Sequence, residues 1–298
     1  MIPFRDRLGT GLLLADGAMG TMLLPHLQAG QCPEVLVLEK PDLLQSIAEQ
    51  YLAAGADILQ TNTFGASPLK LAAYGLAERM EDIVTQACRI VRGAVGDKAY
   101  VSGTCGPTGE LLTPYGTRTP EELYETFRRQ IACLATGGAD LVSIETMTDL
   151  REARLAVQAA KAAAPGLPVM ATMSFDKTPK GFYTIMGVSV AQAAEGLLEA
   201  GADVIGANCG QGMDNMVLLA EAFRHITKAP LAFQANAGLP VQKGDTLVYE
   251  ETPRVYAQKA RALKDLGAAV IGGCCGTTPE HIRVLREMLC DPLGPPEP

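Results

Sequence analysis

The chain has 298 residues, and its 33 acidic and 25 basic side chains give a formal net charge of −8. This acidic balance argues against a nucleic-acid partner, and a hydrophobic content of 48% excludes disorder as the main state. No uncharged run reaches the roughly 18 residues that a membrane-spanning helix needs, and the N-terminus has no signal-peptide apolar core. We therefore expect a cytoplasmic globular protein with neither a membrane nor a nucleic acid as its partner.

One phrase recurs along the chain: a glycine, an alanine and usually an aspartate, followed by a short apolar run. It occurs at residues 54–59, 137–142, 200–205 and, with alanine in place of the aspartate, 266–271. A glycine just past a helix takes the left-handed conformation that ends the helix, and a short apolar run is typical of a strand buried on both faces. Each copy is therefore predicted to join a helix to a buried strand.

The copies lie about two strand–helix units of roughly 30 residues apart, so we expect a further strand between each pair and one before the first. In chain order the expected strands are residues 11–15, 58–59, 99–103, 141–142, 168–172, 204–205, 230–234 and 270–271, and the helices that follow them are residues 41–54, 78–95, 120–136, 149–164, 190–200, 214–227, 253–266 and 279–289. Eight units without a mid-chain linker predict a single (β/α)8 TIM barrel over residues 1–291 rather than an open doubly wound sheet. The proline-rich residues 292–298 are expected to be a tail or linker.

Polar and glycine-rich motifs follow most of the expected strands. They are Asp16-Gly17-Ala18-Met19-Gly20-Thr21, Thr61-Asn62-Thr63-Phe64-Gly65, Gly106-Pro107-Thr108-Gly109-Glu110, Glu145-Thr146, Asn208-Cys209-Gly210, Asn236-Ala237-Gly238 and Gly272-Gly273-Cys274-Cys275-Gly276-Thr277. In a (β/α)8 barrel the loops at the carboxyl ends of the strands converge on one cavity, which holds the active site. These motifs are therefore expected to form a single site at that mouth.

Three cysteines belong to these motifs, and three thiolates can form three corners of a tetrahedral zinc site that leaves the fourth position open for substrate. Cys274 and Cys275 can share a metal with Cys209 only if the chain leaves strand geometry there, which the flanking glycines allow. The alternative is that these thiols pack in the fold and the glycines cradle a phosphate. The other cysteines are expected to act as small hydrophobes; they are Cys32, Cys88, Cys105, Cys133 and Cys290.

Two carboxylates also lie at expected strand ends. Asp16 and Glu145 can bind a cationic group in the cavity, while the backbone N–H groups of Gly17 and Ala18 hold an anion. Together they describe a site for an amino acid. The alternative is that Asp16 caps a turn and Glu145 pairs with a lysine or arginine. No histidine is assigned to a metal, because His225 and His281 lie near helix ends, where solvation or capping is the ordinary role.

Over residues 8–290 these motifs resemble the zinc-dependent homocysteine S-methyltransferases, and the strand-eight motif is most similar to that of the homocysteine-binding module of cobalamin-dependent methionine synthase. The resemblance implies that Cys209, Cys274 and Cys275 bind Zn²⁺. It implies that Asp16 and Glu145 bind the amino group of L-homocysteine and that the Gly17-Ala18 backbone meets its carboxylate. It also implies Asn236 as the fourth zinc ligand when substrate is absent, and Thr61 and Asn62 as pocket residues.

The implied reaction is attack of a zinc-bound substrate thiolate, with no protein nucleophile, on the methyl group of methylcobalamin or another methylcorrinoid. We expect a separate corrinoid-binding domain or protein to carry that donor, because no region of this chain is expected to bind a corrinoid. Betaine or S-methylmethionine as the donor, and a zinc-dependent binding module without turnover, are the alternatives. Betaine is disfavoured because a quaternary ammonium favours an aromatic cage, whereas the chain has no tryptophan and carries Gly65 where the betaine-using branch has an aromatic residue. The mouth is expected to stay open, because the connections 104–119 and 175–189 are loop-like and too short for a capping domain.

Overall fold

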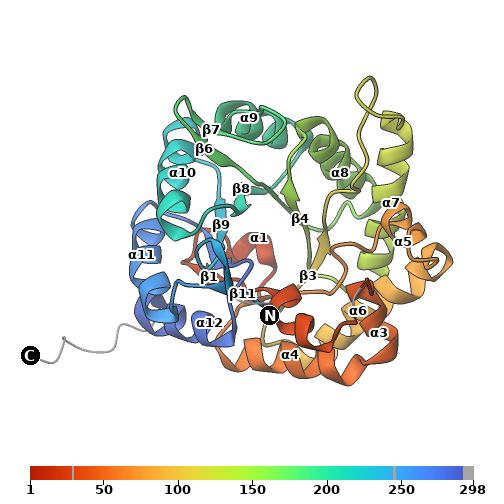
Figure 1. The fold of residues 1–298 in the computed structure, drawn as a ribbon, viewed down its shortest axis with the longest axis horizontal. Coiled ribbons are helices and arrows are strands. Elements are labelled where there is room, and N and C mark those ends of the chain that lie inside the picture. Colours follow the sequence, from red (N-terminus) through yellow and green to blue (C-terminus); the bar gives the residue numbers. More distant parts are fainter. Residues whose placement is uncertain (29, 244–245, 291–298) are drawn as a thin grey trace, which may run out of the picture.

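The computed structural model describes residues 1–28, 30–243 and 246–290. Eight parallel strands form one sheet that curls into a ring (Figure 1). They are β1 (Leu13–Leu14), β2 (Ile58–Gln60), β3 (Tyr100–Cys105), β4 (Leu141–Met147), β5 (Val169–Met173), β8 (Val204–Cys209), β9 (Leu231–Ala235) and β12 (Val270–Gly273). A bridge between Ala15 and Ile58 joins the first strand to the second. The predicted (β/α)8 barrel is confirmed, whereas the predicted tail at 292–298 lies outside the described residues.

Helices surround the ring and connect its strands (Figure 1). The longer ones are α4 (Pro41–Ala53), α6 (Met80–Val95), α7 (Pro120–Thr136), α8 (Leu150–Ala163), α9 (Val190–Ala200), α10 (Met213–Ile226), α11 (Pro253–Asp265) and α12 (Pro279–Leu285), with short pieces at α1 (Phe4–Arg7), α2 (Met19–Leu23), α3 (Leu36–Glu39) and α5 (Pro68–Ala72). Single turns of 3₁₀ helix occupy Leu24–His26, Pro33–Val35 and Ala77–Arg79. The last predicted helix was too long as a regular element, because α12 ends at Leu285 and continues as one π turn over Arg286–Cys290.

Two β-hairpins lie outside the barrel sheet. β6 (Asp176–Thr178) pairs with β7 (Gly181–Tyr183), and β10 (Pro240–Lys243) pairs with β11 (Thr246–Tyr249), both antiparallel. The prediction of a loop over residues 175–189 was wrong in this part. Each hairpin belongs to a connection that follows a strand of the barrel, β5 and β9, so both are built on the carboxyl-end side.

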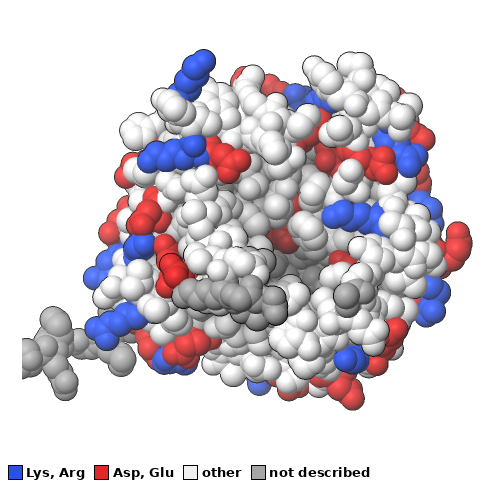
Figure 2. Space-filling model, in the orientation of Figure 1, with Lys and Arg blue, Asp and Glu red and all other residues white. Residues whose placement is uncertain are grey.

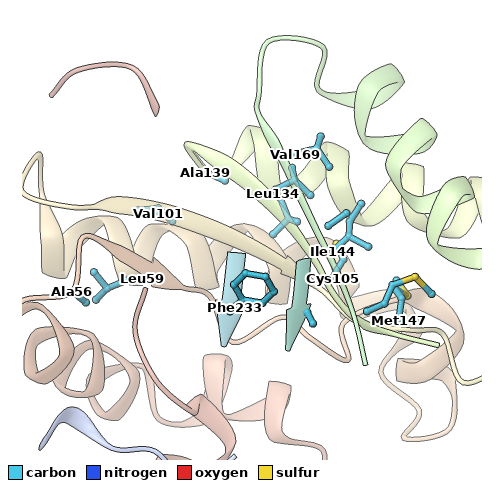
Figure 3. Packing of buried hydrophobic residues seen from close by; sticks show 14 of the residues in the cluster. Ala56, Leu59, Val101, Cys105, Leu134, Ala139, Ile144, Met147, Val169 and Phe233 are labelled. Carbon is cyan, nitrogen blue, oxygen red and sulfur yellow. The ribbon is translucent and has the colours of Figure 1, made fainter. Parts of the chain in front are cut away.

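Side chains along each barrel strand alternate between two environments. Side chains that point outward pack against the helices, as Leu59, Val101, Ile144 and Phe233 do (Figure 3). Those that point inward form a second apolar cluster, which consists of Phe4, Leu13, Ala15, Ile58, Tyr100, Leu141, Met170, Val204, Ala232 and Val270. The Phe4 ring of α1 meets the Tyr100 ring edge-on at 5.3 Å. The amino-terminal half of the barrel is therefore filled and closed, which leaves the carboxyl-terminal half for a site.

The aspartate of the repeated phrase has a structural role at the closed end. Asp57, Asp140 and Asp203 accept hydrogen bonds from the backbone N–H groups of Leu14, Val101 and Val169 at 2.8, 2.7 and 2.8 Å. Each carboxylate thus ties the start of its own strand to a neighbouring strand. The fourth copy has Ala269 at this position and cannot make the bond. Among the described residues, no helix is long and apolar enough to cross a membrane.

Candidate active site

The inward-facing positions of the barrel become polar toward the carboxyl ends of the strands. Two residues beyond the apolar cluster, the strands place a buried polar layer of Gln60, Ser102, Ser143, Thr172 and Gln234. Two residues further on lie Glu145, Asn208, Asn236 and Cys274, because alternate residues of a strand share a face. Figure 2 shows a hollow at the centre of this face, with acidic atoms in its floor and mostly uncharged atoms around its rim. The motifs singled out in the sequence therefore meet at one mouth.

Three thiols come together there, as predicted. The Sγ atom of Cys209 lies 3.0 Å from that of Cys274 and 3.9 Å from that of Cys275. All three sulfurs lie within 4.8 Å of one another, and among the described residues they form the one cluster of at least three such side chains that could hold a metal ion. Tetrahedral zinc with Zn–S bonds of about 2.3 Å sets its sulfurs roughly 3.8 Å apart. The thiols fit zinc in number and softness, and the Cys209–Cys274 pair has to open to reach that spacing.

The backbone is bent at both ends of the cluster. β12 ends at Gly273, so Cys274 and Cys275 lie outside regular strand geometry, as their sharing of one metal requires. Gly276 follows with φ of +82°, a conformation that favours glycine. Cys209 itself has φ of +65°, which is rare for a residue with a side chain and is typical of functional sites. This strained residue turns its thiol toward the two cysteines that follow β12.

Hydrogen bonds within the cluster set its charge in the metal-free protein. The thiols of Cys209 and Cys274 hydrogen-bond Cys275 and hold the pKa of Cys275 well below its usual range. The same contacts, first with Cys209, raise the pKa of Cys274. These hydrogen bonds favour the thiolate form of one sulfur, which is the form that binds a metal.

Two asparagines border the cluster. Asn236 follows β9, and two backbone hydrogen bonds on either side of it join this segment to the paired cysteines. The Cys274 N–H donates to the Ala235 carbonyl at 2.8 Å, and the Ala237 N–H donates to the Cys275 carbonyl at 2.9 Å. Its Nδ2 donates to the Gly210 carbonyl at 2.7 Å, and its Oδ1 is buried without a partner. A buried amide oxygen without a donor is the kind of atom that a metal or a ligand satisfies. Asn236 thus lies where the end of β9 meets the backbone of Cys274 and Cys275.

Asn208 belongs to one of the predicted motifs, but the sequence assigned it no role. Its Oδ1 accepts from the Thr146 N–H and from the Thr172 hydroxyl, both at 2.7 Å. Its Nδ2 donates to the Thr146 hydroxyl at 2.7 Å and to Cys274 Sγ at 3.8 Å. Thr146 also has a positive φ, 59°, at an irregularity in the pairing of β4 with β5. Asn208 therefore fixes the bend after Glu145 and reaches the thiol cluster with the same amide group.

Asp16 and Glu145 are two buried carboxyls that share one neighbour. Gln60 joins them, because its backbone N–H donates to Asp16 Oδ2 at 2.8 Å and its Nε2 donates to Glu145 Oε2 at 2.6 Å. Asp16 Oδ1 is buried without a partner. Burial, and then the charge of Glu145, raises the pKa of Asp16 well above its usual range. Burial raises the pKa of Glu145 to about 7. A cation placed between the two would relieve both desolvation and repulsion.

The remaining predicted site residues are held by contacts within the protein. The Ala18 N–H donates to the Thr277 hydroxyl at 3.1 Å, and a side chain at Gly17 would collide with that hydroxyl, at 2.7 Å. The Thr61 hydroxyl lies 2.6 Å from that of Thr63 and accepts from Thr104 N at 3.1 Å. Asn62 Nδ2 donates to the Pro33 carbonyl at 2.8 Å. Thr61 and Asn62 thus fix the loop after β2 and the segment before α3.

Two residues near the cysteine turn complete the site. Tyr249, the last residue of β11, packs its ring so closely on Gly276 that a Cβ atom at Gly276 would collide with the ring. No signal in the sequence pointed to it, because it lies outside every motif. His281 Nδ1 accepts from the Thr278 N–H at 3.2 Å and so caps α12, as expected. The five other cysteines lie away from the cluster and are buried or half-buried, as expected.

Comparison with known proteins identifies the family. The family model of homocysteine S-methyltransferase matches residues 13–289. Methionine synthase of Mycobacterium tuberculosis is 32% identical over 93% of this chain, and that of Mycobacterium leprae is 31% identical over the same share. This chain spans about a quarter of the length of these relatives, 24% in each case. The fold matches the metallated form of the homocysteine methyltransferase MmuM from Escherichia coli with a TM-score of 0.78, 22% identity and coverage of 93% of this chain and 96% of the other.

The family assignment agrees with the geometry. The matched region contains the whole barrel sheet, the three thiols and both cavity carboxyls. The alternative of a phosphate cradle formed by the glycines does not explain why three sulfurs meet at one point. The chain belongs to the homocysteine S-methyltransferase family of enzymes.

Proposed function

We propose that this protein transfers a methyl group to the sulfur of L-homocysteine and so forms methionine, on a zinc ion held by Cys209, Cys274 and Cys275. The observation that carries the proposal is that two kinds of group meet at the carboxyl-end mouth of the barrel. Three thiols lie together where β8 and β12 end, and two buried carboxyls lie where β1 and β4 end. A ligand with a thiol at one end and an ammonium group at the other matches that arrangement.

The thiols supply the chemistry of the metal end. Bound zinc deprotonates a coordinating thiol at neutral pH. Three cysteine thiolates already outweigh the charge of the ion, so a fourth sulfur keeps the electron density that makes it a nucleophile. Attack forms a sulfur–carbon bond to the methyl group, and the bond between carbon and the donor breaks with its electron pair left on the donor. Asn236, with its orphaned Oδ1, is our proposal for the ligand that yields to substrate.

The carboxyl pair supplies the amino-acid end. Gln60 orients the carboxylate of Glu145 and, through its backbone, that of Asp16. The carboxyls of Asp16 and Glu145 have raised pKa values and no cationic partner among the described residues. A substrate ammonium group would therefore find two acceptors that no protein cation occupies. We place the substrate carboxylate near the Gly17-Ala18 backbone, which requires the Thr277 hydroxyl to release the Ala18 N–H. We further propose Thr61 and Asn62 as residues that shape the pocket from behind.

A methylcorrinoid, carried by another domain or protein, is the donor that we propose. A donor on a large flat macrocycle needs an open mouth, and Figure 2 shows an open hollow on this face. Betaine needs an aromatic cage, and the position of Gly65 offers no room for one. A Cβ atom there would lie 2.7 Å from Glu34 Oε1, which accepts the Gly65 N–H at 2.6 Å. The buried Glu34 carboxyl thus fills the space that an aromatic side chain would need.

One assay separates the candidates. The zinc-loaded protein is incubated with homocysteine and, in parallel, with methylcobalamin, betaine or S-methylmethionine, and methionine is measured. We expect slow turnover with free methylcobalamin, faster turnover when a corrinoid-carrying domain is added, and none with betaine. Robust activity with betaine, or with S-methylmethionine but not methylcobalamin, would overturn the donor. Zinc-dependent homocysteine binding without methionine from any donor would indicate a binding module.

A further inference from the structure

The side chain of Asn208 joins the two ends of the proposed substrate site. Its Oδ1 accepts a hydrogen bond at 2.7 Å from the Thr146 N–H, and this N–H belongs to the peptide group that follows Glu145. Its Nδ2 donates to the Thr146 hydroxyl, also at 2.7 Å. Asn208 is buried and stands directly before Cys209 in the chain. One side chain therefore holds the residue after a cavity carboxyl to the residue before a cluster thiol.

These hydrogen bonds cross a whole strand of the barrel. Thr146 belongs to β4 and Asn208 to β8, and β5 lies between them in the sheet. The Thr172 hydroxyl of β5 donates to the same Asn208 Oδ1 at 2.7 Å. Asn208 Nδ2 also reaches Cys274 Sγ, after β12, at 3.8 Å. A single amide group thus contacts the ends of two neighbouring strands and one thiol of the cluster.

The amide group lies between two strained backbone positions. Thr146 has φ of +59° and Cys209 has φ of +65°, and among the described residues these two are the positions other than glycine with a positive φ. Such a conformation persists only where surrounding contacts over-determine it. The two hydrogen bonds to Thr146 are contacts of this kind. The bend after Glu145 and the bend at Cys209 are therefore tied to each other through Asn208.

We propose that Asn208 is a positioning residue that sets the length of the amino acid the site accepts, and so selects homocysteine over cysteine. The inference rests on the proposed function, in which zinc binds the substrate sulfur and Glu145 binds the ammonium group. Cysteine is shorter by one methylene group, which is one carbon–carbon bond of about 1.5 Å. Because the separation of the two anchors is fixed, cysteine reaches only one of them at full strength. Enzymes discriminate against one missing methylene group by about 10- to 200-fold, and we expect the wild type to fall in this range.

The test measures the affinities of L-homocysteine and L-cysteine for the zinc-loaded protein by isothermal titration calorimetry, with the zinc content checked after each titration. Thr146→Val removes the hydroxyl that accepts from Asn208 and keeps a branched side chain of the same size, whereas Thr146→Ser keeps the hydroxyl. Loss of one hydrogen bond changes an equilibrium about two- to tenfold. We expect the homocysteine-to-cysteine affinity ratio to fall by that factor in Thr146→Val and further in Asn208→Ala, which loses both bonds. Thr146→Ser should keep the wild-type ratio.

A third ligand separates this role from general support of the site. 4-Mercaptobutanoate has no amino group and does not use Glu145, so its affinity should stay unchanged in Thr146→Val. Equal binding of both amino acids by the wild type, an unchanged ratio in Thr146→Val, an equal weakening of all three ligands, or an equal fall in Thr146→Ser would each overturn the proposal. If Asn208→Ala loses zinc or does not fold, the two Thr146 variants decide. A wild type that binds homocysteine but forms no methionine with any donor would count against the proposed function and leave this inference standing.

Discussion

Substitution of Glu145 by glutamine tests the amino-acid end of the site. The change keeps the shape of the side chain and an oxygen that can accept the 2.6 Å hydrogen bond that Gln60 Nε2 donates to Glu145 Oε2. It removes the negative charge. A hydrogen bond to a charged group contributes roughly 1.5–3 kcal/mol. We therefore expect homocysteine to bind about 10- to 150-fold more weakly. Isothermal titration calorimetry of the zinc-loaded protein measures this loss, and the zinc content should stay unchanged.

The pH dependence gives a second and more specific signature. The pKa of Glu145 is about 7 in the empty site, so the carboxyl must lose a proton before it can hold an ammonium group. Homocysteine affinity in the wild type should therefore carry a component that weakens about tenfold for each pH unit below 7 and is flat above it. Glu145→Gln should lack this component. The proton released by the substrate thiol is common to both proteins and cancels in the comparison.

Two controls show whether the effect belongs to the amino group. The ligand 4-mercaptobutanoate keeps the thiol and the carboxylate of homocysteine but has no amino group, so Glu145→Gln should hardly alter its binding. Glu110→Gln changes a half-buried carboxylate of the β3–α7 connection that pairs with Arg118 at 3.3 Å, and it should leave homocysteine binding intact. An equal loss of affinity for both ligands in Glu145→Gln would refute the reasoning and make Glu145 a structural residue.

Three further predictions concern the metal and the stability of the barrel. Purified protein should contain about one zinc per chain, measured by elemental analysis. Alanine at Cys209, Cys274 or Cys275 should deplete the zinc, whereas alanine at the half-buried Cys133 of α7 should not. Equal zinc content in all four variants would rule out the assignment. Because the barrel core does not depend on the mouth, chelation should leave the far-UV circular dichroism unchanged, unlike in a zinc finger, and a loss of helical signal would contradict this. Glu145→Gln should stabilise the metal-free, ligand-free protein at pH 8, by at most about 3 kcal/mol, and hardly at pH 4. The raised pKa means that the native state holds a proton that the unfolded state releases between pH 4.5 and about 7, so the wild type loses stability as pH rises through that window; equal melting temperatures of the two proteins at pH 8 would contradict the assigned pKa.

Much of the fold could be read from local pattern. The glycine that recurs after four of the helices, and the apolar run that follows it, placed strands and helices close to their observed positions, because helix termination and burial depend on neighbouring residues. The thiol cluster could be predicted for a related reason. In a closed barrel all carboxyl ends of the strands meet at one rim, so a cysteine at the end of β8 and two cysteines just after β12 come together whatever lies between them.

Other parts of the site depend on contacts that no local pattern specifies. Gln60 reads as an ordinary end of a strand, yet it joins Asp16 to Glu145, which lies 85 residues further along the chain. Tyr249 lies outside every motif, and its place over Gly276 depends on how the connection after β9 folds back. The sequence by itself determined which chemical groups reach the mouth, because strand order and side-chain alternation follow from local periodicity. Only the tertiary structure decided which of these groups touch, because hydrogen bonds between loops depend on ångström-scale positions that the packing of the whole barrel sets.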